Sequence, residues 1–370
     1  MNKYVAYVSS YTQNDKYGIT IYDVDMKKGR FAKKGVVEVS NSSYITLSHN
    51  QKYLYTITDL GVESYKILPD GKLKKTSMQS INGMRGCYIS TDYEDKFLFV
   101  GGYHDGKITV LKLKPGGTIG EITEEIYLKG MGNLSDRNFH PHVNCVKMSR
   151  DNEYLLAADL GMDHVNVYQL NHTTGKLKLV DIIRSEQDSA PRHLKFSKSG
   201  KFLYIVHEIK NYIDVYSYDN SNKGNPVFEK IQTIPTLNDY HAKGNAASSV
   251  NISYDYKYIT ASNAGDNSVC LYKILQDGTL EKLFCLPISG EYPKDVSLFP
   301  DSKHLVSCNN ESDTLTFFNV DPEQKTLIMN GPELKVEKPN CVIFKKLDEE
   351  PAAEKAEKAE KAEKVEKPAK

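Results

Sequence analysis

A short phrase recurs seven times along the chain: a basic or polar residue, an aromatic or bulky residue, and then a run of β-forming residues. The copies begin at Lys3, Lys52, Lys96, Glu153, Lys201, Lys257 and Lys303. Successive copies start 44 to 57 residues apart. Self-similarity at a period of about 50 residues is typical of propellers and solenoids. The pattern therefore predicts seven copies of one structural unit.

Each unit contains two predicted hairpins. An alternating segment with a turn precedes the phrase, as in residues 43–50, and a second hairpin follows it, as in residues 268–284 around Asp277-Gly278. Four short strands without an amphipathic helix between them are typical of a propeller blade. We therefore predict an all-β fold, a seven-bladed β-propeller of four-stranded blades around a central funnel.

The two ends of the chain predict how the ring closes. The first unit begins directly at Lys3-Tyr4, without the strand that precedes the other copies, and residues 340–344 look like that missing strand. We expect this C-terminal strand to pair with residues 4–8 in the N-terminal blade, because closure removes two open sheet edges. The propeller would then occupy residues 1–347.

Residues 348–370 differ from the rest because they are rich in Glu, Lys and Ala and have no apolar face to bury. We expect a disordered tail. A docking segment for a protein partner is the alternative interpretation.

The composition excludes several function classes. The chain has 48 basic and 48 acidic residues and no basic stripe, so we expect no nucleic-acid partner. It has no signal-peptide pattern and no apolar run approaching ~20 residues, which predicts a cytoplasmic protein without a membrane partner. The six cysteines include no C-x-x-C pair, so buried reduced thiols are expected.

The blade geometry predicts where a ligand site would lie. The start of the innermost strand and the end of the second strand lie at the same rim, because the two strands are antiparallel. From strand starts we expect at this rim Ser43, Tyr44, Cys87, His142, Asn144, Arg192, His193, Ser249, Lys294 and Asp295. From strand ends we expect Asp59, Tyr103, Asp159, Glu208, Asn263 and Asn309. These groups converge on one mouth of the funnel, the expected place for a ligand.

Five phrases in this order, at residues 138–146, 158–163, 190–194, 206–209 and 261–263, resemble the lactonase family of seven-bladed propellers. That family includes the bacterial propeller-type 6-phosphogluconolactonases and the fungal carboxymuconate cyclases. The resemblance spans roughly residues 3 to 345. It implies cofactor-free hydrolysis of a sugar lactone, in the first place 6-phosphogluconolactone to 6-phosphogluconate in the pentose phosphate pathway.

The resemblance also implies roles for individual residues. His142 matches the first histidine of a His-x-His pair, Arg192 and His193 match a Pro-Arg-His-Leu phrase, and Glu208 matches an acid that ends the next strand. Four positions depart from the family pattern: Asn144 replaces the second histidine, Ser249 a glutamate, and Ala264 and Lys294 each an arginine.

Opening a lactone requires a water molecule that loses a proton and a donor for the developing oxyanion. His142 or Glu208 would be the base, and Arg192 would hold an anionic substrate group or the oxyanion. The groups expected to bind a lactone or sugar phosphate are Tyr103, Asn144, Asp159, His193, Ser249, Asn263 and Lys294. Structural roles remain open for four residues: a salt bridge between Arg192 and Glu208, a hydrogen-bonded rim position for His142, and a turn brace at Asp159.

Two other functions remain open. A degenerate, non-catalytic propeller would bind a small sugar acid in the funnel or a protein partner at its rim, which the four departures favour. A metal-dependent lactonase ranks last, because metal sites need clustered oxygen ligands and the predicted rim has too few acids, so we assign no metal ligand.

Overall fold

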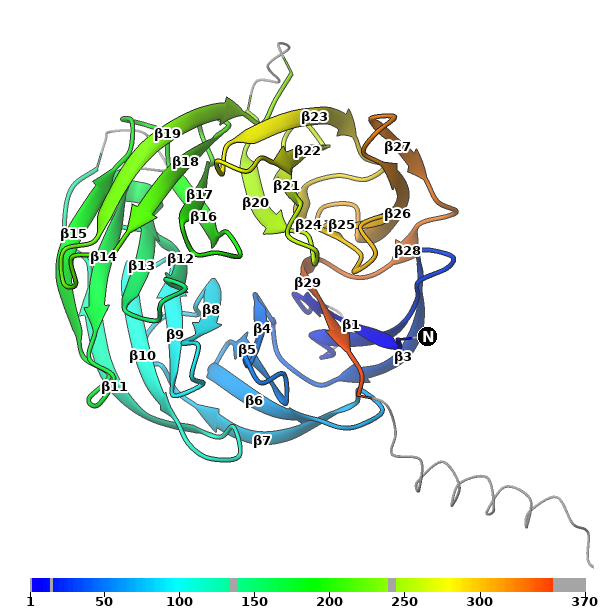
Figure 1. Cartoon of the computed structure of the whole chain (residues 1–370). Helices are drawn as coiled ribbons and strands as arrows, with labels where there is room; N and C mark the ends of the chain where they lie inside the picture. The colour runs from blue at the N-terminus through cyan, green and yellow to red at the C-terminus, as the bar shows by residue number, and fades with distance from the viewer. Residues whose placement is uncertain (1, 14–15, 133–138, 239–243, 349–370) are drawn as a thin grey trace, which may run out of the picture.

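The computed structural model describes residues 2–13, 16–132, 139–238 and 244–348. These residues form seven antiparallel sheets that stand around a central channel as the blades of a propeller (Figure 1). Each blade has four strands in sequential order, except that the first blade takes its inner strand from the C-terminal end and the seventh has a short fifth strand. The predicted all-β, seven-bladed fold is confirmed.

Blade 1 contains β29 (Pro339–Lys346), β1 (Tyr4–Ser10), β2 (Ile19–Asp25) and β3 (Arg30–Val37). Blade 2 contains β4 (Ile45–Leu47), β5 (Tyr53–Thr58), β6 (Gly61–Ile67) and β7 (Leu73–Gln79). Blade 3 contains β8 (Tyr88–Thr91), β9 (Phe97–Gly102), β10 (Lys107–Leu113) and β11 (Ile119–Tyr127). Blade 4 contains β12 (Val143–Met148), β13 (Tyr154–Asp159), β14 (His164–Leu170) and β15 (Leu177–Arg184), with the short 3-10 helix η1 (Leu160–Met162) between β13 and β14.

Blade 5 contains β16 (Pro191–Phe196), β17 (Phe202–His207), β18 (Tyr212–Asp219) and β19 (Val227–Pro235). Blade 6 contains β20 (Ala247–Ile252), β21 (Tyr258–Asn263), β22 (Ser268–Ile274) and β23 (Leu280–Pro287). Blade 7 contains β24 (Pro293–Leu298), β25 (His304–Asn309), β26 (Thr314–Asp321) and β27 (Thr326–Met329), and the short β28 (Leu334–Lys335) also pairs with β26.

The burial of a strand depends on its place in the blade. In blade 3 the second strand, β9, is buried along its whole length, whereas the outer strand β11 has exposed and half-buried positions along most of its length. The inner strands pack face to face with neighbouring blades, and one core cluster joins Phe99 and Val110 of blade 3 to Val146 and Leu156 of blade 4. The hydrophobic core is therefore a set of interfaces between blades.

The predicted closure of the ring is confirmed by the pairing of β29 with β1. Ala6 lies opposite Phe344 and Val8 opposite Val342 in an antiparallel register. Cys341 and Val342 are buried in cores shared with neighbouring blades. Residues 349–370 lie outside the described residues, so the disordered tail expected for residues 348–370 stays a prediction.

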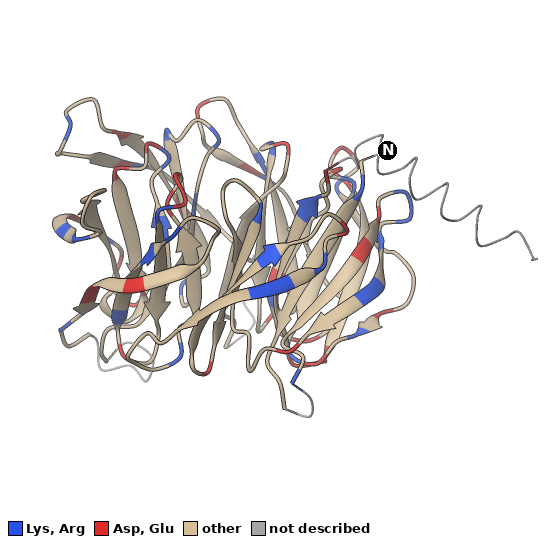
Figure 2. Cartoon of the chain, turned by 90° about the horizontal axis from the view of Figure 1, so that it is seen from below, with Lys and Arg blue, Asp and Glu red and all other residues tan. Residues whose placement is uncertain are grey.

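The strands span the ring between two faces, as the side view shows (Figure 2). We call the face where the inner strands begin the loop face, and the face where they turn into the second strands the turn face. No helix among the described residues is long and apolar enough to cross a membrane.

We predict that ending the chain at residue 338 lowers the melting temperature by ~10 °C, since it removes β29 with its buried Cys341 and Val342 and costs roughly 5 kcal/mol. A chain that ends at Asp348 is the control and should melt like the full chain. Differential scanning calorimetry of the three proteins tests this, and equal melting temperatures would show that β29 does not hold the ring closed.

Candidate functional site at the loop face

The channel opens at the loop face into a polar cavity of about 400 Å³. Its wall is formed by the starts of all seven inner strands together with loops that follow the second strands. The inner strands and their approaches contribute Ser43, Tyr44, Cys87, Tyr88, Asn144, Arg192, His193, Ser248, Ser249, Lys294, Asp295 and Asn340. The other elements contribute Tyr11, Tyr103, His104, Glu208, Tyr292, Asn310 and Glu311.

A backbone irregularity recurs at the start of the inner strand in five of the seven blades, at residues that line this cavity. The register of β12 against β13 shifts across Asn144, and the same shift occurs across Arg192 in blade 5 and Lys294 in blade 7. In blade 6 the shift covers Ser248 and Ser249, and in blade 1 it lies opposite Ser9 and Ser10. A β-bulge leaves its extra residue without a partner and changes the direction of its side chain. We call these positions the bulge ring.

Arg192 and Glu208 form an ion pair in the wall of the cavity. Arg192 Nη1 donates to Glu208 Oε2, and the side chains are 19% and 7% exposed. Burial by itself would lower the pKa of Arg192, but the Glu208 carboxylate overrides burial and the pKa is raised. Arg192 therefore remains a cation. The structure joins these two predicted site residues, with the carboxylate largely shielded from water.

Lys294 is a second cation of the bulge ring, and it has no carboxylate partner among the described residues. Its Nζ donates to Asn340 Oδ1 at 2.8 Å and to the Tyr11 hydroxyl at 3.2 Å, and it lies 4.4 Å from the centre of the Tyr11 ring. Burial, reinforced by the positive charge of Arg192, lowers the pKa of Lys294 to about 7. This ammonium group therefore titrates near neutral pH.

The floor of the cavity is aromatic. The Tyr44 and Tyr88 rings lie 4.4 Å apart, and His193 meets the Tyr88 ring edge-on at 5.3 Å. The amide of Val250 donates to His193 Nδ1 at 3.2 Å, and His193 Nε2 lies 3.3 Å from the Tyr88 hydroxyl. Burial places the pKa of His193 well below its ordinary value. His193 is therefore a neutral wall residue with both ring nitrogens engaged.

His142, predicted as a base, lies behind the wall. Its ring stacks on Tyr103 at 4.2 Å, and its Nδ1 lies 2.6 Å from the Tyr103 carbonyl oxygen, to which it must donate. Burial lowers the pKa of His142, so the ring is neutral at pH 7. His142 is absent from the cavity lining, whereas Tyr103 lines the cavity. The structure thus places His142 as a support for Tyr103.

Two predicted binding residues, Asp159 and Asn263, do not line the cavity. Asp159 is fully buried and accepts a hydrogen bond from the amide of His142 at 2.8 Å, and burial raises its pKa to about 6. Asn263 is also fully buried and donates through Nδ2 to the carbonyl of Thr236 at 2.5 Å. Both side chains end a second strand and fold back onto backbone groups, so their assignment to binding is corrected to bracing.

Of the four positions that depart from the family pattern, all but Ala264 line the cavity. Asn144 and Ser249 line the cavity, and the buried Nδ2 of Asn144 has no hydrogen-bond partner among the described residues. Ser249 is linked to Ser262 at 3.0 Å between hydroxyl oxygens. Ala264 is buried and outside the cavity wall.

Sequence reasoning missed several cavity residues. Tyr11, Tyr292 and Asn310 belong to loops, whose course around the mouth no repeat pattern predicts. Asn340 is the bulge-ring member of blade 1, and its place beside Pro339 in β29, like that of Arg192 beside Pro191 and Lys294 beside Pro293, was a signal that could have identified it.

The described residues also include one group with metal-like spacing, away from this cavity. Ligand atoms of Asp92, Glu94 and His172 lie within 4.8 Å of one another at the turn face. Asp92 already accepts hydrogen bonds from the amides of Lys96 and Phe97. Its carboxylate thus braces a turn.

The structure is therefore a closed propeller with a polar cavity at the loop face. Residues 5–344 match the family described as the lactonase, seven-bladed β-propeller family. This match covers most of the chain, and the protein therefore belongs to that family. The predicted resemblance is confirmed.

Relatives of known sequence support the same grouping. The chain is 27% identical over 351 residues to the 6-phosphogluconolactonase of Bacillus subtilis strain 168, covering 93% of this chain and 99% of that protein. It is 30% identical over 345 residues to an uncharacterised protein of Lactococcus lactis subsp. cremoris strain MG1363, covering 91% and 98%.

Solved structures show the same fold. A putative 6-phosphogluconolactonase from Bacteroides fragilis superposes with a TM-score of 0.84 at 26% identity, covering 93% of this chain and 98% of that one. A periplasmic gluconolactonase from Pseudomonas aeruginosa has a TM-score of 0.85 at 24% identity, covering 94% and 100%.

We predict that the pKa of Lys294 lies near 7 and rises in the variant Arg192→Met, since removing a neighbouring cation makes the charged form of Lys294 less costly. An NMR titration of the Lys294 side-chain carbon next to Nζ measures both values. Lys16→Gln, an exposed change at the loop face, is the control and should leave the titration unchanged. A pKa near 10 in the unaltered protein, or no response to Arg192→Met, would contradict this electrostatic account.

Proposed function

We propose that the protein hydrolyses a sugar lactone in the cavity at the loop face, with 6-phosphogluconolactone as the substrate. The observation that carries this proposal is the convergence of Arg192, Lys294 and Glu208 in one cavity of about 400 Å³. Two cations suit a substrate that carries a phosphate group and develops an oxyanion, and a carboxylate suits the transfer of a proton. Membership of the lactonase family and the names of the relatives support the same reaction.

Glu208 is the best placed general base among the carboxylates of the cavity. The other two carboxylates are engaged by different groups. Asp295 accepts hydrogen bonds from Asn251 Nδ2 and the amide of Val342, and Glu311 accepts one from Lys338 Nζ. Arg192 Nη1 donates to Glu208 Oε2, which fixes the orientation of this carboxylate in the cavity. A base must lie within hydrogen-bond reach of the water that it activates. Glu208 lines the cavity and His142 does not, which supports Glu208 as the base.

The proposed reaction has two steps. Water attacks the lactone carbonyl carbon while Glu208 takes one proton from it, the developing oxyanion is stabilised by the Arg192 guanidinium, and the Lys294 ammonium binds the substrate phosphate. The bond between the carbonyl carbon and the ring oxygen then breaks, and the proton passes from Glu208 to the leaving oxygen. The product is the open-chain hydroxy acid, and Glu208 returns to its starting state.

A second candidate function has its own observation. Arg192 and Glu208 satisfy each other, His142 stands behind Tyr103, and Ala264 lies outside the cavity. A propeller that binds a sugar acid without cleaving anything requires only the polar wall. Hydrolysis assays distinguish this function from the first.

We predict that Glu208→Gln lowers kcat for 6-phosphogluconolactone by about 100-fold or more, because it removes the general base. Initial rates, corrected for spontaneous opening of the lactone, measure this effect. Lys16→Gln should match the unaltered protein, and circular dichroism must show that both variants are folded. Binding of 6-phosphogluconate without hydrolysis by the unaltered protein would favour the non-catalytic propeller.

We predict that the KM for 6-phosphogluconolactone rises as the pH increases through about 7, because Lys294 is charged below its pKa and loses its charge above it. The KM for uncharged gluconolactone should change less over the same range. Lys294→Met should have a raised KM for the phosphorylated lactone that no longer depends on pH in this window. An unchanged pH profile in Lys294→Met would remove Lys294 from substrate binding.

A further inference from the structure

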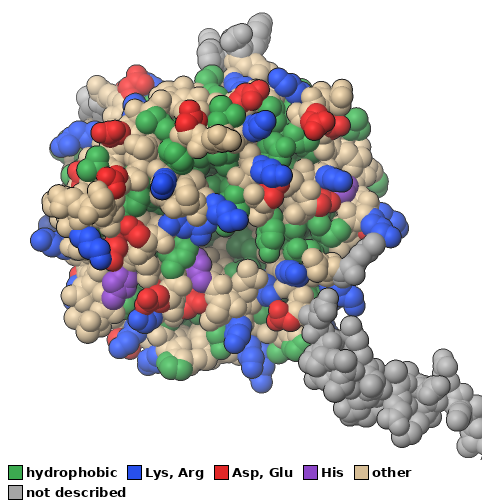
Figure 3. Space-filling model, in the orientation of Figure 1, with side chains coloured by type: hydrophobic (Ala, Val, Ile, Leu, Met, Phe, Trp, Pro, Cys, Tyr) green, Lys and Arg blue, Asp and Glu red, His purple; other side chains and the backbone are tan. Residues whose placement is uncertain are grey.

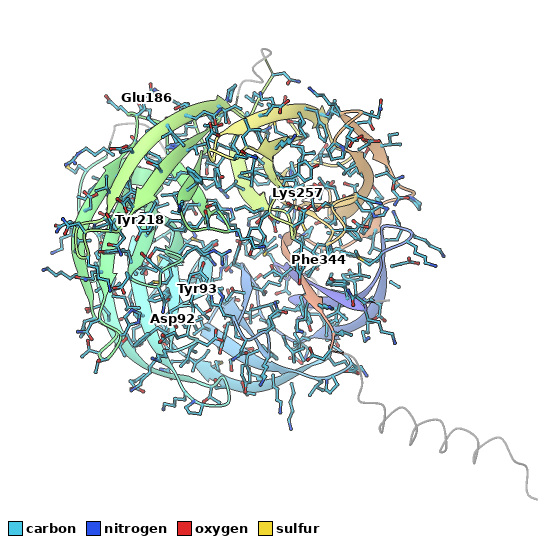
Figure 4. The ribbon with its side chains drawn as sticks, viewed as in Figure 1. Asp92, Tyr93, Glu186, Tyr218, Lys257 and Phe344 are labelled. Atoms are coloured by element: carbon cyan, nitrogen blue, oxygen red, sulfur yellow. The ribbon has the colours of Figure 1, made fainter. Side chains whose placement is uncertain are left out.

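A second cavity, of about 510 Å³, lies where the channel opens at the turn face. It is formed by the inner strands and first turns of blades 2 to 6. In the view onto this face, Lys and Arg side chains gather beside the central hollow (Figure 3). Tyr93, one of the lining residues, lies beside the channel in the same orientation (Figure 4). The proposed lactonase site uses none of this cavity.

Two lysines enter this cavity from equivalent positions of neighbouring blades. Lys147 of β12 and Lys195 of β16 each follow the bulge residue of their strand by three positions. Neither forms an ion pair with a carboxylate or an identified hydrogen bond through Nζ among the described residues. Burial, and the nearby charges of Lys195 and Arg150, lower the pKa of Lys147 to about 8. The positive charges of the two lysines therefore repel each other.

Arg150 adds a third cation in a fixed position. Its Nη2 donates to the Tyr256 hydroxyl at 2.9 Å and its Nε to the carbonyl of Ser197 at 3.3 Å. The guanidinium lies 5.5 Å from the ring centres of Tyr93 and Tyr256. Its two aromatic neighbours hold the charge without neutralising it.

The acids around this cavity are engaged elsewhere. Asp295, inside the channel, accepts from Asn251 Nδ2 at 2.6 Å and from the amide of Val342 at 3.0 Å. Asp95 accepts from the amides of His49 and Asn50 at 2.7 and 2.9 Å. No carboxylate belongs to the lining of the cavity within the described ranges. The cavity is therefore cationic without an internal counter-charge.

We propose that the turn-face cavity binds a phosphorylated small molecule, with Lys147, Lys195 and Arg150 around the phosphate. Three converging donors that carry positive charge suit a multiply charged oxyanion better than a single carboxylate. Tyr254 and Tyr256 present aromatic surface in the same cavity, which suits the organic part of such a ligand. An adjoining groove of about 1140 Å³ shares Tyr93, Arg150 and Tyr256 and leaves room for it. This binding site does not depend on lactone hydrolysis.

The probes are inorganic pyrophosphate, a hexose phosphate and a nucleoside diphosphate, each compared with chloride at the same ionic strength. Thermal unfolding and isothermal titration calorimetry of the full chain measure binding. We expect the melting temperature to rise with at least one probe, and Lys147→Gln/Lys195→Gln to weaken its binding by about tenfold or more, since each charge-assisted hydrogen bond contributes strongly. Binding of pyrophosphate alone would indicate that the cavity recognises the phosphate. Tighter binding of an organic phosphate would indicate that the aromatic surface takes part.

Two variants make the result specific. Lys257→Gln removes a charge that is exposed on the same face, outside the cavity, and should bind like the unaltered protein (Figure 4). Lys294→Met alters the cavity at the loop face and should keep this binding. The ligand-free double variant Lys147→Gln/Lys195→Gln should melt at or above the temperature of the unaltered protein, because repulsion between two cations is removed. Loss of binding in Lys294→Met but not in the double variant would assign the anion to the loop face and overturn the proposal. A melting temperature that no probe changes would overturn it as well.

Discussion

The pairing of β29 with β1 is the constraint on which the rest of the structure depends. Seven sheets can surround a channel only if the last blade meets the first, and here one strand from the C-terminal end completes the N-terminal blade. The ladder hydrogen bonds and the burial of Cys341 and Val342 between blades hold that junction. Closure also brings Asn340 beside Lys294, so the same strand completes the wall of the cavity at the loop face.

The bulge ring is the link between this architecture and its chemistry. In an ordinary antiparallel ladder the side chains of an inner strand alternate between the two faces of its sheet, and here both faces pack on neighbouring blades. The shift across Asn144, Arg192 and Lys294 interrupts this alternation at the start of the strand, where these residues line the cavity. Charged groups can therefore enter a cavity whose surroundings are a buried sheet, where burial and the neighbouring charge of Arg192 lower the pKa of Lys294.

The two ends of the channel use cations in different ways. At the loop face Arg192 is neutralised by Glu208, and that pair can orient a base as well as bind an anion. At the turn face Lys147, Lys195 and Arg150 converge without a lining carboxylate in the described part of the chain. A paired cation suits catalysis because it brings a carboxylate with it, whereas unpaired cations suit the retention of an anion.

The sequence by itself determined the number of blades, their four strands, the closing strand and the rim at which polar residues gather, because these follow from hydrophobic periodicity and from the antiparallel order of strands. It also placed Arg192 and Glu208 at matching ends of neighbouring strands, and the structure shows that they form an ion pair there. Only the tertiary structure decided which rim residues face the cavity. His142, Asp159 and Asn263 belong to the same rim as Arg192 and Lys294, yet they do not line the cavity, and their side chains or amides bond to backbone groups or to each other behind the wall. The physical reason is that the direction of a side chain at a strand end is set by bulges and by loops from other blades, such as those that carry Tyr11 and Tyr103, and these contacts join residues far apart in the chain.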